Sequence, residues 1–527
     1  MIRFFSIVFV CALSLHMLGQ QSLNVRKIKS LDRGSTSYSG SWVYVNDAGE
    51  EYGLVGSASG TAIYPLEEGN NQELAFIHGP PSIWREITVI GDHAYVTTEG
   101  NGENEGLQVL ELSELPDTAY LLMTYDSTFT RGHILQKDVF NPDKPYIYVS
   151  GTDSTGGVHI LDVSDPAKPK QVGLHDPVPY IHDVHVRGDR MYTFQFFATT
   201  IEVVDISDKT NPTVIATIDD PGAATHSGWT TEDNNFLIVA DEQDGFDGRI
   251  FDISDLGDVT EVSTFSANPQ AFVHNPYVRG DFAYMAHNKE GLRVYDVVDP
   301  SNPVEVGYYD TVTDANPESG GLWSACPYIP SGKVIGGDRD LGLVVWDVDE
   351  VYASRFSGVV RDAQTLQPID SAKVSLAVPG GRRLYTNGFG EYKGGRPGEP
   401  LILLLFEKEG YFTETRNVSL SQDKQQIVDV FLKRASTATL PIVQDSDWKI
   451  WPNPARDFVQ VNLSEVPAEL AFLQLADISG RLVSTHSISY QDTIDISTQG
   501  LTNGVYTLSL LNVIGQIVAV KRLSVKK

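Results

Sequence analysis

The chain has 527 residues, with 39 Lys and Arg against 69 Asp and Glu and a formal net charge of −30. This length predicts two to four domains with at least one large core. An aromatic content of 10% argues against a disordered acidic chain, and the negative charge argues against a nucleic-acid binder, because phosphates need a basic surface.

The first 20 residues have the pattern of a secretory signal peptide. Arg3 precedes an apolar run over residues 4–18, which is too short for a spanning helix. A membrane anchor is the alternative, but no later stretch approaches 18 apolar residues, so we expect no transmembrane segment in the mature chain. Cleavage removes Cys11 and leaves Cys326, which cannot form an internal disulfide. We expect Cys326 to be a buried small residue.

A repeated segment with β-type alternation recurs at intervals of 43 to 51 residues. The copies are anchored at Pro65, Glu111, Asp162, Asp205, Asp252, Asp296 and Asp347. Such a period predicts propeller blades of four strands each, and seven copies predict seven blades. We expect the repeated aspartates to accept hydrogen bonds from nearby backbone N–H groups at strand ends; metal binding by them is the alternative.

The two ends of the repeat region predict how the ring closes. The seventh unit supplies three strands, over about residues 322–347, before the chain leaves for another domain. Residues 22–31 alternate like a fourth strand. We expect this segment to pair with the seventh blade, which would remove a free sheet edge.

Residues 35–350 resemble the LVIVD-repeat propellers called choice-of-anchor B proteins. The motifs that carry the resemblance are Tyr52-Gly-Leu-Val-Gly56, Ser82-Ile-Trp-Arg-Glu-Ile87, Thr225-His-Ser-Gly-Trp-Thr-Thr-Glu-Asp233, Gly291-Leu-Arg-Val-Tyr-Asp296 and Pro330-Ser-Gly332. The resemblance implies a surface-displayed or secreted propeller over residues 21–354, with no established catalytic residues.

The middle segment, residues 355–434, resembles the carboxypeptidase-regulatory-like β-sandwich. The resemblance is carried by Phe356-Ser-Gly-Val-Val-Arg-Asp-Ala, Pro368-Ile-Asp-Ser-Ala-Lys-Val, Thr386-Asn-Gly-Phe-Gly-Glu-Tyr392 and Glu409-Gly-Tyr411. Short strands joined by Gly turns predict a sandwich independently. The resemblance implies a spacer or stabilising module. A polar linker follows at residues 435–447.

Residues 448–527 resemble the type A sorting domain of type IX secretion. The motifs are Trp451-Pro-Asn-Pro-Ala-Arg-Asp457, Asp477-Ile-Ser-Gly-Arg481, Gly504-Val-Tyr506 and a basic end. The resemblance implies passage through the type IX machinery of a Bacteroidota-type bacterium, removal of the domain, and then release or attachment to surface glycolipid. An Ig-like module retained in the mature protein is the alternative. The predicted fold is therefore all-β: a seven-bladed β-propeller followed by two small β-sandwich domains.

One aromatic or histidine residue falls near the start of each predicted inner strand, at intervals of 42 to 49 residues. These residues are Trp42, Trp84, His133, His182, His226, His274 and Trp323. Equivalent positions form a ring around a propeller channel, so the four histidines are candidate ligands for a transition metal or donors to an anionic ligand. The three tryptophans are candidate ligand-channel residues. The alternative is that each side chain bonds the backbone of a neighbouring blade.

A second set of polar residues follows the second strands and is expected in loops on one rim. This set comprises Glu99, Asp153, Asp241, Glu242 and Asp338. Of this set, Asp241 shares a short Gly-containing loop with Asp244 and Asp247, and this loop suggests calcium; solvated turn acids are the alternative. The candidate cofactor is thus a divalent ion, either calcium or a transition metal.

No common catalytic motif occurs in the sequence: there is no Gly-x-Ser-x-Gly, P-loop, His-Glu-x-x-His or Cys-x-x-Cys. We therefore expect an exported binding protein for a glycan, peptide or ion. The alternative is a secreted hydrolase or lyase that uses the channel histidines and rim acids, with or without a metal. Residues 21–354 hold 19 Lys and Arg against 52 Asp and Glu, so the acidity belongs to the propeller and favours divalent ions or cationic ligands over anionic polymers.

Overall fold

The structure is a computed structural model that describes most of the chain. The described residues are 22–34, 37–220, 224–243, 246–266, 273–312, 320–376, 383–422, 425–435, 448–463, 470–478, 481–488, 493–512 and 517–527. The predicted signal peptide, nearly all of the predicted linker and Asp244 lie outside them. The chain divides into two compact units, the second made chiefly of residues 432–527.

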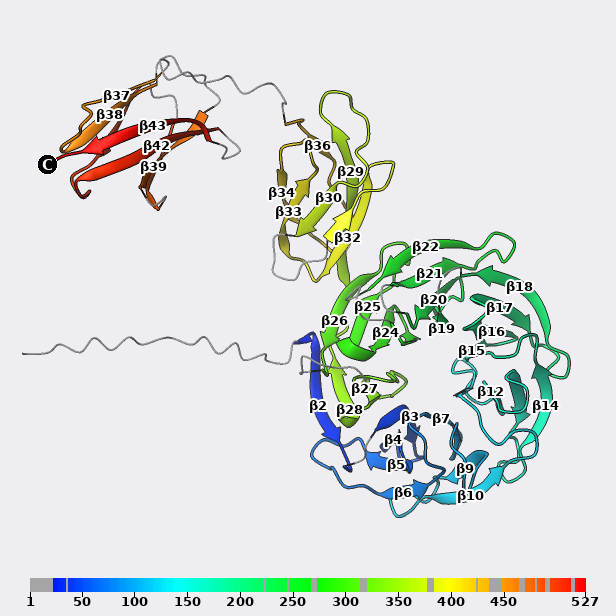
Figure 1. The fold of residues 1–527 in the computed structure, drawn as a ribbon. Helices are drawn as coiled ribbons and strands as arrows, with labels where there is room; N and C mark the ends of the chain where they lie inside the picture. Colours follow the sequence, from blue (N-terminus) through cyan, green and yellow to red (C-terminus); the bar gives the residue numbers. More distant parts are fainter. Residues whose placement is uncertain are drawn as a thin grey trace, which may run out of the picture. The chain divides into compact units, whose positions relative to one another are not determined.

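In the part of the chain that the structure describes, seven antiparallel sheets form a ring of blades (Figure 1). Blade 1 consists of β3 (Tyr38–Val45), β4 (Glu51–Ser57), β5 (Gly60–Pro65) and β6 (Ala75–His78). Blade 2 consists of β7 (Arg85–Ile90), β8 (His93–Thr98), β9 (Leu107–Glu111) and β10 (Tyr120–Tyr125). Blade 3 consists of β11 (Ile134–Gln136), β12 (Tyr146–Ser150), β13 (Val158–Asp162) and β14 (Lys170–His175).

Blade 4 consists of β15 (Asp183–Arg187), β16 (Arg190–Gln195), β17 (Thr200–Asp205) and β18 (Thr213–Asp219), and blade 5 of β19 (Thr225–Thr230), β20 (Phe236–Asp241), β21 (Gly248–Asp252) and β22 (Thr260–Phe265). Blade 6 consists of β23 (Asn275–Arg279), β24 (Phe282–His287), β25 (Gly291–Asp296) and β26 (Val304–Tyr309). Blade 7 consists of β27 (Val334–Asp338) and β28 (Gly342–Val348) together with β2 (Val25–Leu31). A single 3-10 turn, η1 (Asn288–Glu290), joins β24 to β25.

The N-terminal segment closes the ring. Strand β2 pairs antiparallel with β28, from Val25 opposite Val348 to Leu31 opposite Leu343, and β1 (Ser22–Leu23) pairs with β26 of blade 6. The predicted pairing with the seventh blade is therefore confirmed for Val25–Leu31, whereas Ser22–Leu23 pair with blade 6 instead. Because the first and last parts of the propeller share one sheet, its unpaired edges are protected.

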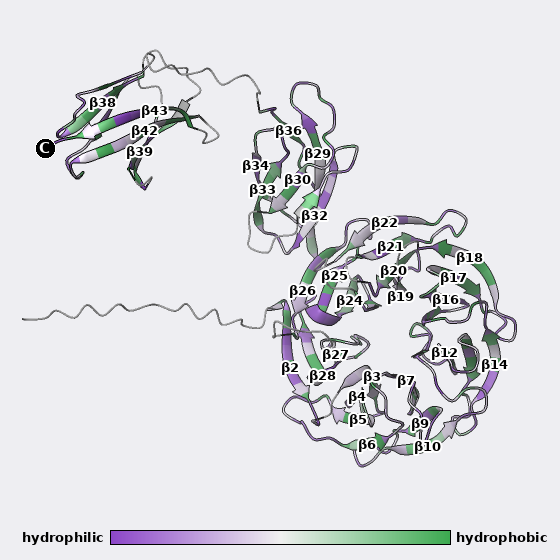
Figure 2. Cartoon of the chain, in the orientation of Figure 1, coloured by the Kyte–Doolittle hydropathy of each residue, from purple (hydrophilic) through white to green (hydrophobic). Residues whose placement is uncertain are grey.

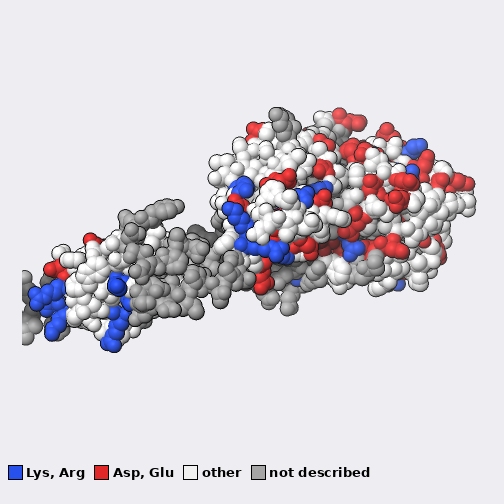
Figure 3. All heavy atoms as spheres, turned by 90° about the horizontal axis from the view of Figure 1, so that it is seen from above, with Lys and Arg blue, Asp and Glu red and all other residues white. Residues whose placement is uncertain are grey.

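Hydrophobic side chains fill the spaces between and within blades. The central strands β4, β5, β24 and β25 are buried almost throughout, and hydrophobic residues mark the strands of every blade (Figure 2). Cys326 is fully buried, as the sequence predicts, and it lies in this core. Acidic side chains cover much of the propeller surface seen in Figure 3, so charge lies outside and apolar area inside.

The repeated aspartates end the third strands in the predicted way. Asp162, Asp205, Asp252 and Asp296 each accept a hydrogen bond from the backbone N–H two residues later. Asp296 has a further role, since it is fully buried and also accepts hydrogen bonds from Arg355 and from the backbone N–H of Ala353. It thereby fixes the strand that leaves the propeller.

Two β-sandwiches follow the propeller. The first has one sheet of β32 (Glu391–Pro397), β29 (Ala353–Asp362), β35 (Gln426–Ile427) and β36 (Val430–Leu432), and another of β31 (Arg383–Tyr385), β30 (Lys373–Leu376), β33 (Leu401–Glu407) and β34 (Glu414–Ser419). The second has β37 (Lys449–Trp451), β38 (Phe458–Asn462) and β41 (Thr493–Ser497) opposite β40 (Leu482–Ser487), β39 (Leu470–Asp477), β42 (Gly504–Asn512) and β43 (Ile517–Val525). The predicted all-β architecture is confirmed.

Lys29 of the closing strand gives a direct test of ring closure. Its Nζ donates to the backbone carbonyls of Pro65, Glu67 and Asn70, each at 2.8 Å, and the side chain is buried. Lys29→Met should lower the free energy of unfolding by about 3 kcal/mol, because three carbonyls lose a charged donor. Chemical denaturation measures this loss.

Arg26→Met in the same strand is the matched control. Its ion pair with Asp347 is more than half exposed at both ends, so we expect a loss below about 1 kcal/mol. Equal losses for the two variants would contradict the role assigned to Lys29.

Candidate functional site

Four histidines lie at the same end of consecutive blades. His133, His182 and His274 stand immediately before the inner strands β11, β15 and β23, and His226 is the second residue of β19. All four are buried. Their rings form a continuous row, with centroid separations of 4.4 Å, 4.1 Å and 4.4 Å along the chain order. The row follows the ring of blades.

Hydrogen bonds between blades hold three of these imidazoles. Nδ1 of His182 lies 3.0 Å from the carbonyl oxygen of His226, Nδ1 of His226 lies 2.9 Å from that of His274, and Nδ1 of His274 lies 3.0 Å from that of Trp323. We call these three contacts the interblade latches. The structure thus shows the backbone bonding that the sequence left as an alternative to ligand binding.

The latches determine which ring nitrogen carries the hydrogen. A backbone carbonyl only accepts, so Nδ1 must be the donor in each ring. Burial, the largest cause, holds the pKa of His182 and His226 well below the usual value of 6.5, and it lowers the pKa of His274 to about 3. The three rings are therefore neutral near pH 7, and Nε2 of each has an unprotonated lone pair.

Small polar side chains make equivalent contacts around the rest of the ring. Ser39 donates to the carbonyl of Arg85, Thr97 to that of Gly132, and Ser150 to that of His182. Ser324 lies 3.5 Å from the carbonyl oxygen of Ser39 and links blade 7 to blade 1. Every junction between neighbouring blades thus has a side-chain contact to a backbone carbonyl.

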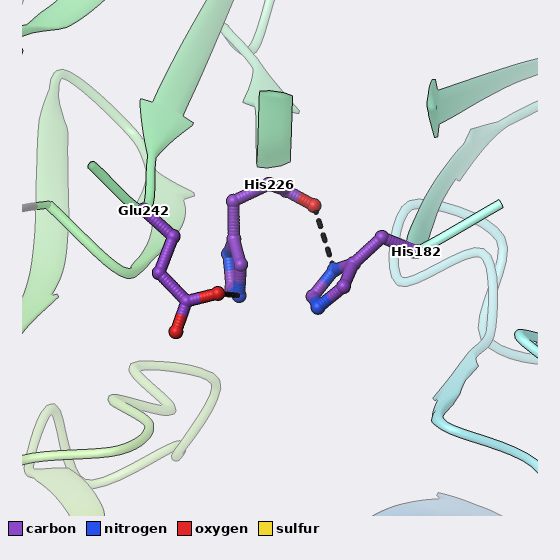
Figure 4. Close-up of side chains that lie close together, drawn as sticks. All are labelled: His182, His226 and Glu242. Atoms are coloured by element: carbon purple, nitrogen blue, oxygen red, sulfur yellow. Dashed lines mark hydrogen bonds and ion pairs between the residues drawn. The ribbon is translucent and has the colours of Figure 1, made fainter. Parts of the chain in front are cut away.

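Two carboxylates complete a polar cluster at the histidine row. Nδ1 of His133 lies 2.7 Å from Oε1 of Glu99, and Nε2 of His133 lies 2.9 Å from Nε2 of His182. Nε2 of His226 lies 3.5 Å from Oε2 of Glu242, and the side chains of His182, His226 and Glu242 point toward one another (Figure 4). Ligand atoms of these three residues all lie within 4.8 Å of one another.

The two carboxylates differ in their environment. The hydrogen bond from His133 lowers the pKa of Glu99, whereas burial raises the pKa of Glu242. The side chain of Glu242 nevertheless keeps 31% of its surface exposed. Solvent therefore reaches the cluster beside Glu242, while the imidazole of His226 is buried behind it.

The three predicted channel tryptophans occupy different places. Trp323 continues the histidine row, 4.6 Å from His274 by ring centroids, and its Nε1 donates to Glu86 at 2.6 Å. Trp84 precedes β7 and is 36% exposed. Trp42 lies elsewhere: its ring contacts Tyr328, and the residue that occupies the row position in blade 1 is Ser39, three residues earlier.

Trp42 belongs to a second layer of rings, in which His185, Trp229 and Tyr277 each lie three residues after a histidine of the row. The layer comprises Trp42, His185, Trp229, Tyr277 and Tyr328, with centroid separations of 4.4–6.0 Å between neighbours. Side chains therefore fill the part of the channel that this layer crosses. The accessible polar cluster lies on the histidine side of the layer.

Only part of the candidate calcium loop is described. Asp241 is buried, and its Oδ1 accepts a hydrogen bond from the backbone N–H of Ala224. Asp247 is partly exposed just before β21, and Asp244 lies outside the described residues. Calcium binding by these three residues stays a prediction.

Aromatic side chains flank the histidines on the accessible side. Tyr180 lies 6.3 Å from His133 and 6.1 Å from His182 by ring centroids, and Phe197 packs 5.7 Å from Tyr180. Phe196 contacts both His182 and Phe197. Phe197 is 78% exposed. Tyr180, Phe196 and Phe197 form an aromatic wall beside the polar cluster.

The sequence named Glu99 and Glu242 as rim acids that could act together with the channel histidines, but it did not pair either acid with a particular histidine. The connection follows from topology. In an antiparallel pair of strands, the first residue of one strand and the last residue of the next lie at the same end of the pair. His226 begins β19 and Glu242 follows β20, and these two strands are paired. That relation was available from the predicted strand order.

Comparison with known proteins identifies two parts of the chain. The secretion system C-terminal sorting domain matches residues 449–526, and the LVIVD repeat matches residues 145–176, 181–220 and 275–311, which fall in blades 3, 4 and 6. The sorting domain indicates secretion or cell-surface attachment through type IX secretion. No helix among the described residues is long and apolar enough to span a membrane.

The remaining comparisons add little about function. None of the curated proteins matches the chain. Among solved structures, the chain is similar to a Bacteroides fragilis protein provisionally described as a 6-phosphogluconolactonase, with 14% identity and a TM-score of 0.44. The alignment covers 64% of this chain and 95% of that one. At this score the likeness supports no statement about activity.

Acid should destabilise the propeller through its buried neutral histidines. Burial lowers the pKa of His185 from 6.5 to about 3. Between these values the unfolded chain binds a proton that the folded chain does not, so the free energy of unfolding falls as the pH falls below 6.5. In His185→Phe, the loss of stability between pH 7.5 and pH 5 should be about 2 kcal/mol smaller than in the wild type.

Chemical denaturation at the two pH values measures the difference. Phe keeps an aromatic ring beside Trp229 and Tyr192, so packing in the layer is retained. Parallel stability profiles for wild type and variant would show that His185 does not contribute to acid sensitivity.

Proposed function

We propose that this chain is an exported binding protein whose propeller binds its ligand at the histidine-bearing mouth of the channel. The observation that carries the proposal is the pairing of a polar cluster with an aromatic wall at one accessible place. Glu99, Glu242 and the histidine row supply hydrogen-bonding groups, and Phe197 exposes a ring beside them. Ligand sites combine a few convergent polar groups with aromatic surface in this way.

The other parts of the chain serve export and display in this proposal. A signal peptide over residues 1–20 directs the first export step in a Bacteroidota-type bacterium, and residues 448–527 engage the type IX machinery. Residues 355–434 act as a spacer of the carboxypeptidase-regulatory-like kind, and residues 435–447 as a linker. The propeller, residues 21–354, belongs with the choice-of-anchor B proteins. After removal of the sorting domain, the product is released or attached to surface glycolipid.

A secreted hydrolase or lyase is the second candidate. The contact between His226 and Glu242 favours it, because a buried imidazole beside a carboxylate is a possible acid–base pair. A binding role ranks first because no common catalytic motif occurs in the sequence. Turnover of a glycan or ester substrate by the purified chain, lost in Glu242→Gln, would reverse this ranking.

The binding role can be tested on an array of glycans and peptides probed with the purified full chain. Phe197→Ala should weaken binding to the retained ligand about tenfold, since it removes an exposed ring worth about 1.4 kcal/mol of contact. The matched control is Phe389→Ala, which removes a ring that is 74% exposed in the first sandwich. Equal binding by Phe197→Ala and the wild type would contradict a site at this mouth.

A further inference from the structure

We propose that His182, His226 and Glu242, with His133 as fourth ligand, form a site for one divalent transition-metal ion at the mouth of the channel. The proposal rests on the proposed binding role of this mouth and names the ion that the site takes. It uses only side chains that the structure already brings together, and each ligand is placed by a contact of its own.

The separations between ligand atoms suit a single ion. Nε2 of His226 and Oε2 of Glu242 are 3.5 Å apart, and Nε2 of His133 and Nε2 of His182 are 2.9 Å apart. Two ligands of one tetrahedral zinc ion, each about 2.1 Å from the metal, lie about 3.4 Å apart. The first pair is close to this separation, and ligand atoms of His182, His226 and Glu242 already lie within 4.8 Å of one another. His133 contacts only His182 of these three, so its Nε2 would have to move toward the ion to become the fourth ligand.

The latches aim unprotonated nitrogens at the site. Because Nδ1 of His182 and of His226 donates to a backbone carbonyl, each Nε2 presents a lone pair. An ionised Glu242 then leaves two acceptors, its Oε2 and Nε2 of His226, facing each other with no hydrogen between them. A metal cation resolves this repulsion by bonding to both atoms.

The surroundings of the ligands match those of established metal sites. Metal-binding imidazoles commonly donate their other ring nitrogen to a carbonyl or carboxylate, which fixes the ring orientation. Here His182 and His226 donate to backbone carbonyls, and the second nitrogen of His133 faces Glu99 at 2.7 Å. All three histidines therefore have an outer partner already in place.

The ligand chemistry selects the class of ion. Three imidazoles and one carboxylate suit Zn²⁺ and other late divalent transition metals, whereas Ca²⁺ prefers oxygen ligands throughout. The partly exposed side chain of Glu242 gives an ion access from solvent. The acidic propeller surface attracts cations from a distance (Figure 3).

A hydrogen bond from a protonated Glu242 to Nε2 of His226 is the competing explanation of the short contact. It accounts for the His226–Glu242 pair without any metal, and an N–H of His133 that donates to Nε2 of His182 accounts for the other close pair. It predicts no ion binding, and it predicts that Glu242→Gln, whose amide can donate to Nε2, keeps the structure and changes nothing else. The two explanations therefore differ in a measurable quantity.

The experiment uses the tag-free full chain, stripped with a chelator and titrated with Zn²⁺. We expect one zinc ion per chain by elemental analysis and calorimetry. His182→Asn, His226→Asn and Glu242→Gln should each weaken zinc binding at least about 100-fold. Asn is chosen because its amide can donate in place of Nδ1 and so preserve the latch, while it lacks a group equivalent to Nε2.

His274→Asn is the matched control. His274 makes the same kind of latch, to Trp323, but is not among the three residues whose ligand atoms cluster. It should bind zinc like the wild type. Melting temperatures of the metal-free variants, expected within a few degrees of the wild type, separate loss of a ligand from loss of fold.

Two results would overturn the metal site. One is the absence of stoichiometric zinc from the wild type, and the other is zinc binding that survives in His226→Asn and Glu242→Gln. If the wild type takes no zinc but Phe197-dependent ligand binding persists, only the metal site is wrong. If zinc binds with the expected variant pattern but the array shows no ligand, the metal site stands and the proposed binding role fails.

Discussion

The donation of an imidazole N–H to the backbone carbonyl of the next blade is the interaction on which the rest of the site depends. It joins blades 4 to 7 through His182, His226 and His274. This hydrogen bond joins neighbouring blades, and it also fixes the tautomer of the ring, because a neutral imidazole that donates through Nδ1 presents a lone pair at Nε2. A hydrogen bond that stabilises the propeller thereby leaves an acceptor nitrogen on the same ring, as the proposed metal site requires.

Blade topology explains why acids meet the histidines. The inner strand of each blade begins where the second strand ends, so loop residues after the second strand lie beside residues at the start of the first. Glu242 reaches His226 within blade 5, and Glu99 of blade 2 reaches His133 of blade 3. Below this level the side chains of Trp42, His185, Trp229, Tyr277 and Tyr328 pack against one another in the channel.

Much of the fold was predictable, because each blade repeats the same alternation and the repeated aspartate marks the end of a strand. The pairing of Val25–Leu31 with the last blade followed from the need to protect an edge, whereas the pairing of Ser22–Leu23 with blade 6 was not predicted. The site was predictable only in part. Spacing placed the four histidines in one row but put Trp42 in the wrong position. A bulge in β3 shifts the register between Tyr38 and Ser41. The repeat interval varies from 42 to 49 residues, so it cannot reveal a shift this small. The direction of each imidazole decides whether it bonds a backbone carbonyl, faces a possible ligand, or does both. This direction depends on contacts with neighbouring blades, so the spacing of residues along the sequence cannot predict it.

The protonation of the ring nitrogens tests this account most directly. Nitrogen NMR of the full chain labelled with ¹⁵N-histidine, with signals assigned through single His→Asn variants, distinguishes the two neutral tautomers. Near pH 7 in the metal-free protein, we expect a hydrogen on Nδ1 and none on Nε2 in His182, His226 and His274. A hydrogen on Nε2 of His182 or His226 would contradict it, because the latch and the lone pair aimed at the cluster would both be lost.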